Sequence, residues 1–236
     1  YNNIPFVHCV MNSKKLNRFF LALLCPLVCF GLEGETLPDQ EEMWQTVYEE
    51  KFEQVENDKL PEYFLVLDGE FKVASHEGRK CLVMSGTPVG EHGILFGPRL
   101  RAESLELSFS CLGGLKSRRH NVFAGTVGGI RGLGFRVNPA SREMIFSAPD
   151  DWQRAFSVNW SSMEWMRLKI RAEGDLYKEK SQVTIEVCKE SDPDQSVLAT
   201  RLVVDGMIRS GKCAIWGFAY SEKKMCWDDL LIRTKN

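Results

Sequence analysis

Apolar and polar residues alternate with a period of two along most of this chain, and this pattern constrains its fold more than any other feature. Between Ser104 and Cys111 every second residue is apolar, and the pattern recurs at 165–171 and 182–187. Such a period places one set of side chains on a core face and the other in water, as in half-buried β-strands. Turn residues such as Asp68-Gly69 and Asp205-Gly206 separate the runs at intervals of about ten residues. The sequence therefore predicts an all-β fold, an antiparallel sandwich or barrel.

Composition and charge exclude several classes of protein. Of the 236 residues, 44% are hydrophobic and 26% are charged, which excludes a disordered chain, a collagen and a multi-span membrane protein. The 30 basic and 32 acidic residues offer no positive field for a nucleic-acid backbone, so no nucleic-acid partner is expected. We predict one globular domain at 47–234, preceded by a polar tether at 32–46.

The first part of the chain is typical of a secretory signal peptide. Residues 1–10 precede the first plausible initiator, Met11, and are interpreted as an upstream extension. From Met11 onward, Lys14, Lys15 and Arg18 precede an apolar run at 19–30. This order predicts a signal peptide at 11–31, because a membrane-spanning helix needs about 20 apolar residues. An uncleaved anchor is the alternative; the signal peptide predicts a secreted or periplasmic protein that leaves the membrane after cleavage.

Five cysteines remain after the predicted leader: Cys81, Cys111, Cys188, Cys213 and Cys226. The odd number leaves at least one thiol without a partner in the chain. Cys213 and Cys226 could face each other across a hairpin. The alternative interpretation is that each cysteine is a small buried hydrophobe in a strand.

Four segments carry a family resemblance: YEEKFEQVENDKLPEYFLVLDGEFKVAS at 48–75, WMRLKIRAEG at 165–174, VTIEVCKE at 183–190 and GKCAIWGFAYSEKKMCWDDLLIRTK at 211–235. Together they resemble the secreted concanavalin A-like (laminin G and glucanase) domains. They are also similar to 3-keto-disaccharide hydrolase-like proteins and to domains of many secreted bacterial proteins. The resemblance implies a two-sheet antiparallel jelly-roll sandwich.

The catalytic signature of the glucanases in this family is absent from the sequence. Those enzymes place acid and nucleophile on one strand face with a Glu-x-Asp-x-x-Glu motif, whereas 103–106 and 186–190 lack three acids in that register. The sequence also lacks a nucleophile elbow, a His-Glu-x-x-His zinc motif and a phosphate-binding loop. We therefore expect a non-catalytic binding module. The alternative is a hydrolase that uses loop residues, with candidates Asp150, Asp151, Glu91 and His92.

An exposed tryptophan in a charged loop suggests a binding site. A sugar ring stacks its apolar face on an indole while carboxylates and arginine bind its hydroxyls. We predict such a platform from Trp152, Asp151, Arg136 and Tyr220, for a carbohydrate or another cell-envelope component. In contrast to Trp152, we assign Trp165, Trp216 and Trp227 to the core. A structural envelope module that binds protein is a further alternative, which a large exposed apolar patch would favour.

Two loops have both a functional and a structural interpretation. The glycine-rich segment 125–134 could present backbone amides to an anion beside Arg131, or could form a tight hairpin. Lys116, Arg118, Arg119 and His120 could bind a polyanion, or could form a solvated turn.

Carboxylates at both ends of the domain suggest a structural calcium ion. In calcium-binding jelly rolls the first and last strands are neighbours, and hard oxygen ligands from both hold the ion. Glu50, Glu53, Asp228 and Asp229 fit that description. The alternative is that Asp229 accepts a hydrogen bond from a backbone turn.

Overall fold

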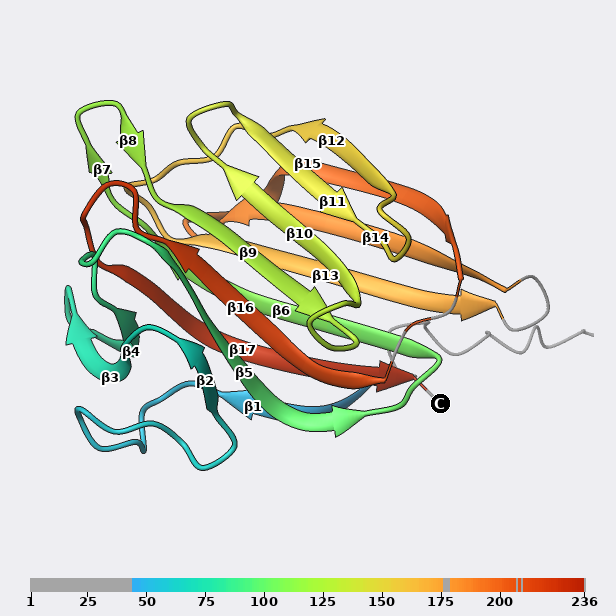
Figure 1. Ribbon diagram of the computed structural model, residues 1–236, viewed down its shortest axis with the longest axis horizontal. Coiled ribbons are helices and arrows are strands. Elements are labelled where there is room, and N and C mark those ends of the chain that lie inside the picture. Colours follow the sequence, from blue (N-terminus) through green and yellow to red (C-terminus); the bar gives the residue numbers. More distant parts are fainter. Residues whose placement is uncertain (1–43, 176–178, 207, 209, 236) are drawn as a thin grey trace, which may run out of the picture. The chain divides into compact units, whose positions relative to one another are not determined.

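The computed structural model describes residues 44–175, 179–206, 208 and 210–235. They form two large antiparallel sheets that face each other, with a small ribbon at one end (Figure 1). The described part contains no helix, and so no helix long and apolar enough to cross a membrane. The two-sheet antiparallel sandwich expected from the sequence is confirmed. The predicted upstream extension and signal peptide, and most of the tether, lie outside the described residues.

In the described part of the chain, half of the strand pairs join strands that are not consecutive in the sequence. The first sheet has the order β15 (Asp192–Asp205), β14 (Lys180–Lys189), β13 (Met166–Asp175), β6 (Ser104–Leu112), β17 (Met225–Lys235), β4 (Arg79–Met84) and β3 (Phe71–His76), with β1 (Gln45–Glu50) also paired to β17. The second sheet has the order β12 (Gln153–Ser157), β11 (Glu143–Ser147), β10 (Leu133–Asn138), β9 (Val122–Val127), β16 (Gly211–Phe218), β5 (Glu91–Leu100) and β2 (Leu65–Asp68). The ribbon joins β7 (Leu115–Lys116) to β8 (Arg119–His120). The predicted pairing of the opening strand with the closing strand is therefore confirmed.

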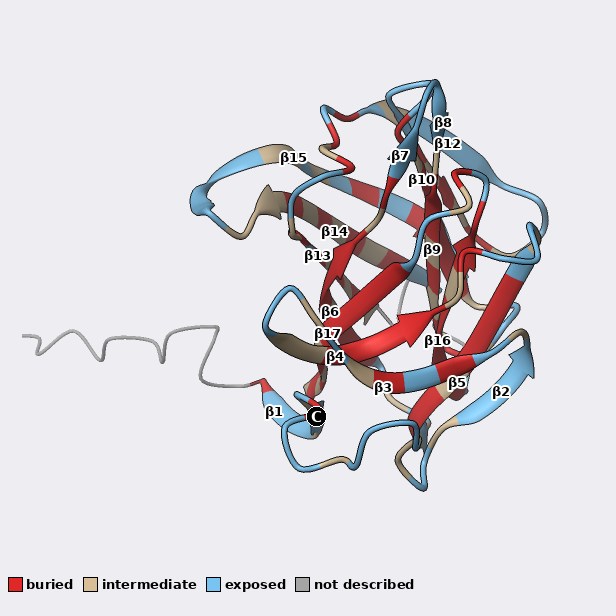
Figure 2. Cartoon of the chain, turned by 90° about the vertical axis from the view of Figure 1, so that its left-hand side faces the viewer, coloured by how far each residue is buried: buried red, intermediate tan, exposed pale blue. Residues whose placement is uncertain are grey.

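The hydrophobic core lies between the two sheets. Phe109 of β6 stacks on Phe135 of β10, with 5.9 Å between ring centroids, and Phe123 of β9 meets the edge of Trp227 of β17 at 5.6 Å. Trp227 is fully buried, as the sequence predicted. In Figure 2 the central strands are mostly red, whereas β2 at the sheet edge is exposed. Burial of each such aromatic side chain stabilises the sandwich by about 1.5–3 kcal/mol.

All five described cysteines are free thiols. Cys213 of β16 packs in the main core between the sheets, whereas Cys226 of β17 packs in a separate small cluster. These two thiols therefore do not face each other across a hairpin. The interpretation as buried small hydrophobes is confirmed for every cysteine except Cys188, which is only half-buried.

The glycine-rich segment forms the tight hairpin between β9 and β10. At Gly132 a Cβ atom would overlap the carbonyl oxygen of Val127, and Gly129 has a φ of +90°, a conformation that glycine adopts without steric cost. The close approach of two chain segments thus accounts for the glycines, as the structural interpretation predicted.

Candidate functional site: an aromatic cleft on the seven-stranded sheet

Alternation along two strands places the candidate site on the outer face of the seven-stranded sheet. On β16, Ile215 is buried in the core, and its neighbour Trp216 lies on the outer face and is half-buried. On β10, Phe135 is buried in the core, whereas Arg136 is exposed. Because side chains of adjacent strands lie side by side on one face, Trp216 and Arg136 belong to the same surface.

Small residues hollow this surface into a cleft of about 440 Å³. Ala124 and Thr126 of β9 and Gly134 of β10 line its centre, where longer side chains would fill the space. Ile145 and Trp216 are among the apolar groups that line it. The cleft is therefore an open, partly apolar groove over the middle strands of the sheet.

Trp216 keeps its position because β5 carries a glycine beside it. Gly93 is the register partner of Trp216, and a Cβ atom at Gly93 would overlap the indole Nε1 atom. The missing side chain lets the indole lie close against the backbone of β5, where it remains half-buried in the wall of the cleft.

An arginine–aromatic group forms part of the cleft wall and extends beyond it. The guanidinium carbon of Arg136 lies 4.0 Å from the ring centroid of Phe218, within the range of a cation–π contact. The Nη2 atom of Arg136 donates to the hydroxyl oxygen of Tyr220 at 3.4 Å, and the Phe218 and Tyr220 rings are 5.9 Å apart. The structure thus brings together two of the four predicted ligand-binding residues, Arg136 and Tyr220.

The other two predicted platform residues lie elsewhere. The ring of Trp152, which is 38% exposed, meets the edge of buried Phe146 at 6.0 Å, and Trp152 is not among the residues that line the cleft. Asp151 is exposed in the turn before β12, with a φ of +60°. Trp216, which was assigned to the core from the sequence, lines the cleft. Its alternation with Ile215 separates the two faces of β16 but does not say which of them is buried.

Among the described residues that line the cleft there are several polar groups, but Glu91 is the single carboxylate. Glu91 and Gln153 are exposed and line it, so an acceptor and an amide are available to a ligand. Glycoside hydrolysis by the usual mechanism needs two carboxyl groups that flank the scissile bond. Of the four loop residues considered for catalysis, only Glu91 lines the cleft. His92 is 8% exposed, and its ring nitrogens contact an Asp68 carboxylate oxygen at 2.8 Å and the Pro88 carbonyl at 3.2 Å.

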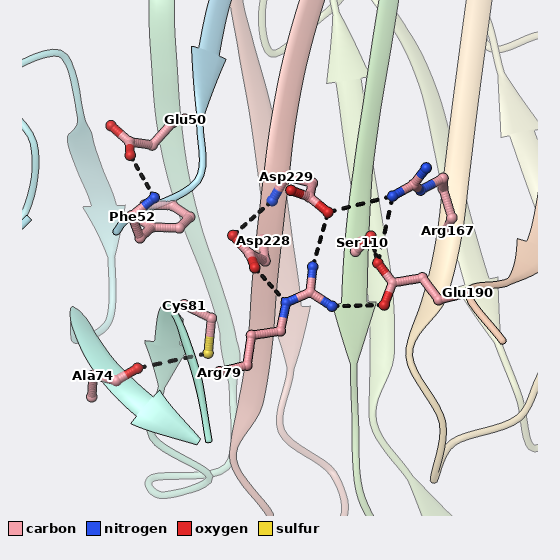
Figure 3. A network of polar contacts seen from close by, with 10 residues as sticks. All are labelled: Glu50, Phe52, Ala74, Arg79, Cys81, Ser110, Arg167, Glu190, Asp228 and Asp229. Carbon is pink, nitrogen blue, oxygen red and sulfur yellow. Dashed lines mark hydrogen bonds and ion pairs between the residues drawn. The ribbon is translucent and has the colours of Figure 1, made fainter. Parts of the chain in front are cut away.

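Two of the four predicted calcium ligands, Asp228 and Asp229, belong to a network of ion pairs centred on Arg79 (Figure 3). The guanidinium donates to Asp228, to Asp229 Oδ2 at 2.9 Å and to Glu190 Oε2 at 2.6 Å. Asp228 is only 4% exposed, and this burial raises its pKa despite the hydrogen bond from Arg79. Burial acts in the same direction on Glu190, but the hydrogen bonds from Arg79 and Ser110, together with the positive charges of Arg79 and Arg167, outweigh it and lower the pKa of Glu190.

Positive charge at this position therefore comes from an arginine side chain. Glu50 accepts a hydrogen bond from the backbone N–H of Phe52 at 2.6 Å, and the backbone carbonyl of Glu53 accepts one from Lys80 Nζ at 3.2 Å. Among the described residues, no three His, Cys, Asp or Glu side chains form a group that could hold a metal ion. Asp229 N–H bonds the Asp228 carboxylate at 2.8 Å, so the side chain that binds the backbone is Asp228 and not Asp229.

The basic loop is largely engaged within the protein. Lys116 and Arg119 both donate to the Glu222 carboxylate, and Lys116 lowers the pKa of that group. His120 Nδ1 contacts Ser162 Oγ at 2.8 Å. These contacts fit the interpretation of the segment as a structured turn.

Comparisons with known proteins identify the fold but no family. No family model matches the sequence, and no curated protein matches it. Among solved structures, the metal-free carbohydrate recognition domain of Emp46p has a TM-score of 0.52 and 9% identity over 80% of this chain and 95% of that one. A receptor binding domain has a TM-score of 0.51 and 10% identity, and HCR/D-Sa-GBL1/C has a TM-score of 0.50 and 13% identity. The alignments with this receptor binding domain and with HCR/D-Sa-GBL1/C each cover 81% of this chain but only 48% of the matched chain. At these identities the likeness shows the jelly-roll sandwich alone.

Proposed function

We propose that this protein is a secreted carbohydrate-binding module and that its ligand lies in the cleft beside Trp216. The observation that carries the proposal is the open groove itself, which Trp216, Arg136, Glu91 and Gln153 all line. An indole offers an apolar face to the C–H groups of a pyranose ring. The charged and amide groups around it bind the ring hydroxyls, which fixes orientation.

Two further observations support the proposal. The carbohydrate recognition domain of Emp46p has the same fold, so this sandwich is compatible with sugar binding, although a fold hosts many functions. The leader-like segment at 11–31 supports export, where glycans and cell-envelope polymers are accessible. A hydrolase remains the less favoured function, because Glu91 is the one carboxylate that lines the described cleft.

The test is a glycan-array screen of the protein, followed by calorimetric titration of each hit and an assay for sugar release. We expect Trp216→Ala to weaken binding by at least about tenfold, because loss of a stacked aromatic group costs on the order of 1.4 kcal/mol or more. Trp216→Phe restores part of the affinity. Trp152→Ala is the matched control, since this exposed tryptophan lies outside the cleft, and it leaves binding unchanged.

The outcomes separate the hypotheses. Equal binding by the wild type and a folded Trp216→Ala variant would contradict the assignment of the cleft, and loss of binding in Trp152→Ala alone would move the site to the β11–β12 loop. Sugar release would identify a hydrolase. Tyr220→Phe and Arg136→Gln measure the contributions of the hydroxyl and of the guanidinium that it contacts.

A second candidate function, protein binding, is favoured by the edge strand β2. Leu65, Val66 and Leu67 are 56%, 37% and 41% exposed, and β2 is the last strand of its sheet. An exposed apolar edge is a template for strand addition by another chain. A Leu67→Lys substitution would block such pairing while leaving the cleft intact. If the protein binds no glycan on the array, that result would favour this candidate.

A further inference from the structure

Two cysteines lie together beneath an aromatic cover on the outer face of the eight-stranded sheet. Cys81 of β4 and Cys226 of β17 are both fully buried and pack in one small apolar cluster with Val83 and Leu112. Trp165 packs against this cluster, and the guanidinium of Arg79 stacks on its ring at 4.2 Å. The two thiols are thus enclosed in a second core, separate from the one between the sheets.

The register of the two strands places the thiols on the same face. Cys226 is the partner of Val83, and Cys81, two positions from Val83, points to the same side of β4. Cys81 and Cys226 are therefore a diagonal pair on neighbouring strands. Beyond the last residue pair of this ladder, Trp227 and Leu82, the side chains of Arg79 on β4 and Asp228 on β17 are in direct contact.

The Cys81 thiol donates to the Ala74 carbonyl at 3.8 Å. The neighbouring Cys226 thiol lowers the pKa of Cys81, and the pKa of Cys226 is raised beside Cys81 and by burial. The other cysteines are placed differently. Cys111 and Cys213 are buried in the main core, and β13 and β6 separate β14, which carries Cys188, from β17.

We propose that Cys81 and Cys226 form a disulfide bond when the chain folds in the presence of a disulfide oxidant. The Cys81 thiolate attacks one sulfur of the oxidant, forms a mixed disulfide and releases one thiolate. The Cys226 thiolate then attacks the Cys81 sulfur of that mixed disulfide and releases the second thiolate. Two protein thiols are oxidised and one disulfide is reduced to two thiols, so atoms and electrons balance. Because both sulfurs are buried in the folded protein, the exchange takes place before β3 and β4 are fully packed.

The bond would fasten β4 to β17 beside the Arg79 ion pairs. It closes a loop that contains most of the domain, and a cross-link over so long a loop restricts the unfolded chain strongly. The proposal is independent of any ligand in the cleft, because both cysteines lie on the other sheet.

The test is to refold the full chain either in a buffer with oxidised and reduced glutathione or in dithiothreitol. The products are then alkylated with iodoacetamide under denaturing conditions and digested with trypsin. We expect the glutathione sample to give the peptide that begins at Cys81 joined to the peptide 225–233, with two hydrogens fewer than the separate peptides. We also expect a melting temperature higher by about 5–10 °C than that of the reduced protein.

Cysteine variants show which thiols cause the difference in melting temperature. Cys226→Ala and Cys81→Ala abolish the difference in melting temperature between the two buffers, whereas the control Cys188→Ala retains it. Alkylation of both Cys81 and Cys226 in glutathione-refolded wild-type protein would overturn the proposal, as would a link from either one to Cys188. The peptide map of the wild-type protein decides the matter even if a cysteine variant fails to fold.

Discussion

At the scale of single residues, Arg79 forms ion pairs with three carboxylates. It compensates Asp228, which is 4% exposed, and also contacts Asp229 and Glu190. Removal of one partner from a buried ion pair leaves an uncompensated charge and costs about 3 kcal/mol or more. We expect Arg79→Ala to lower the free energy of unfolding by about this amount in urea titrations.

The matched control for Arg79 is Lys72, whose ion pair with Asp58 at 2.6 Å is exposed on both sides. Exposed pairs contribute about 0–1 kcal/mol, so Lys72→Ala should change the free energy of unfolding by less than about 1 kcal/mol. Similar losses in the two variants would show that the Arg79 network is no stronger than a surface ion pair.

Glu190 provides a pH-dependent test of the same network. Folding lowers its pKa, so Glu190 adds stability at neutral pH, and this contribution is lost as the pH falls below the unfolded-state value of about 4.3 and through the native one. The pKa of Asp228 is raised, so its effect on the pH dependence of stability has the opposite sign. Asp228 is present in both the wild type and the Glu190→Gln variant, so the difference between them reports on Glu190. We expect the stability of Glu190→Gln to fall less steeply than that of the wild type between about pH 5 and pH 3. Parallel curves from urea unfolding would contradict this.

At the scale of elements, the strands were predictable because their outer and inner residues alternate. The run from Ser104 to Cys111 became β6, and the runs at 165–171 and 182–187 fall largely in β13 and β14. The function of the outer residues was not predictable in the same way. On β16 both faces carry apolar side chains, since Ile215 faces the core and Trp216 lines the cleft, so the period of two identifies two faces without saying which one is buried.

The sequence alone also could not predict which charged residues form ion pairs. Arg79 and Asp228 are 149 positions apart, and they meet because β4 and β17 are neighbours in the sheet. Glu50 lies on β1 and Asp228 and Asp229 lie on β17, and these two strands pair. Arg79, from a third strand, contacts both aspartates, and no pattern local to residues 45–55 or 225–235 could have shown this contact.

One buried asparagine fastens the β8–β9 connection to the β16–β17 turn. Asn121 is 1% exposed; its Oδ1 atom accepts from the N–H and hydroxyl of Ser221, and its Nδ2 atom donates to the Lys223 carbonyl at 3.0 Å. Asn121→Ala would leave these buried groups without partners, at a cost of about 1–3 kcal/mol for each group that water cannot reach. We expect a loss of about 2–3 kcal/mol in the free energy of unfolding.

The control for Asn121 is Asn138, whose side chain accepts one hydrogen bond from Ala140 N–H at 3.1 Å in an exposed turn. Because water can replace that bond, Asn138→Ala should cost less than about 1 kcal/mol by the same urea measurement. An equally small loss for Asn121→Ala would mean that the two loops are held together by other contacts.

At the scale of the whole domain, the outer faces of the two sheets differ in chemistry. The eight-stranded sheet pairs its charges across strands, as in Lys169–Glu186 at 2.6 Å and Arg171–Glu106 at 2.5 Å. The seven-stranded sheet instead presents small and aromatic side chains around a groove. Charges that are paired within the protein are less available to a ligand, so the second sheet is the face suited to binding.

The first and last strands of the described domain pair beside the Arg79 ion pairs, and this arrangement bears on calcium binding. β1 pairs with β17 over Gln45–Glu50, and Arg79 supplies the positive charge that Asp228 and Asp229 require. A calcium ion at one hundred times its Kd would add about 2.7 kcal/mol to the stability. Because the guanidinium already compensates these carboxylates, we expect the melting temperature to be the same, within about 1 °C, in EDTA and in millimolar calcium, since 2.7 kcal/mol would shift it by several degrees. A melting temperature that is higher in calcium than in EDTA for the wild type, but not for Asp228→Asn, would show instead that the ion displaces Arg79 and holds the two strands together.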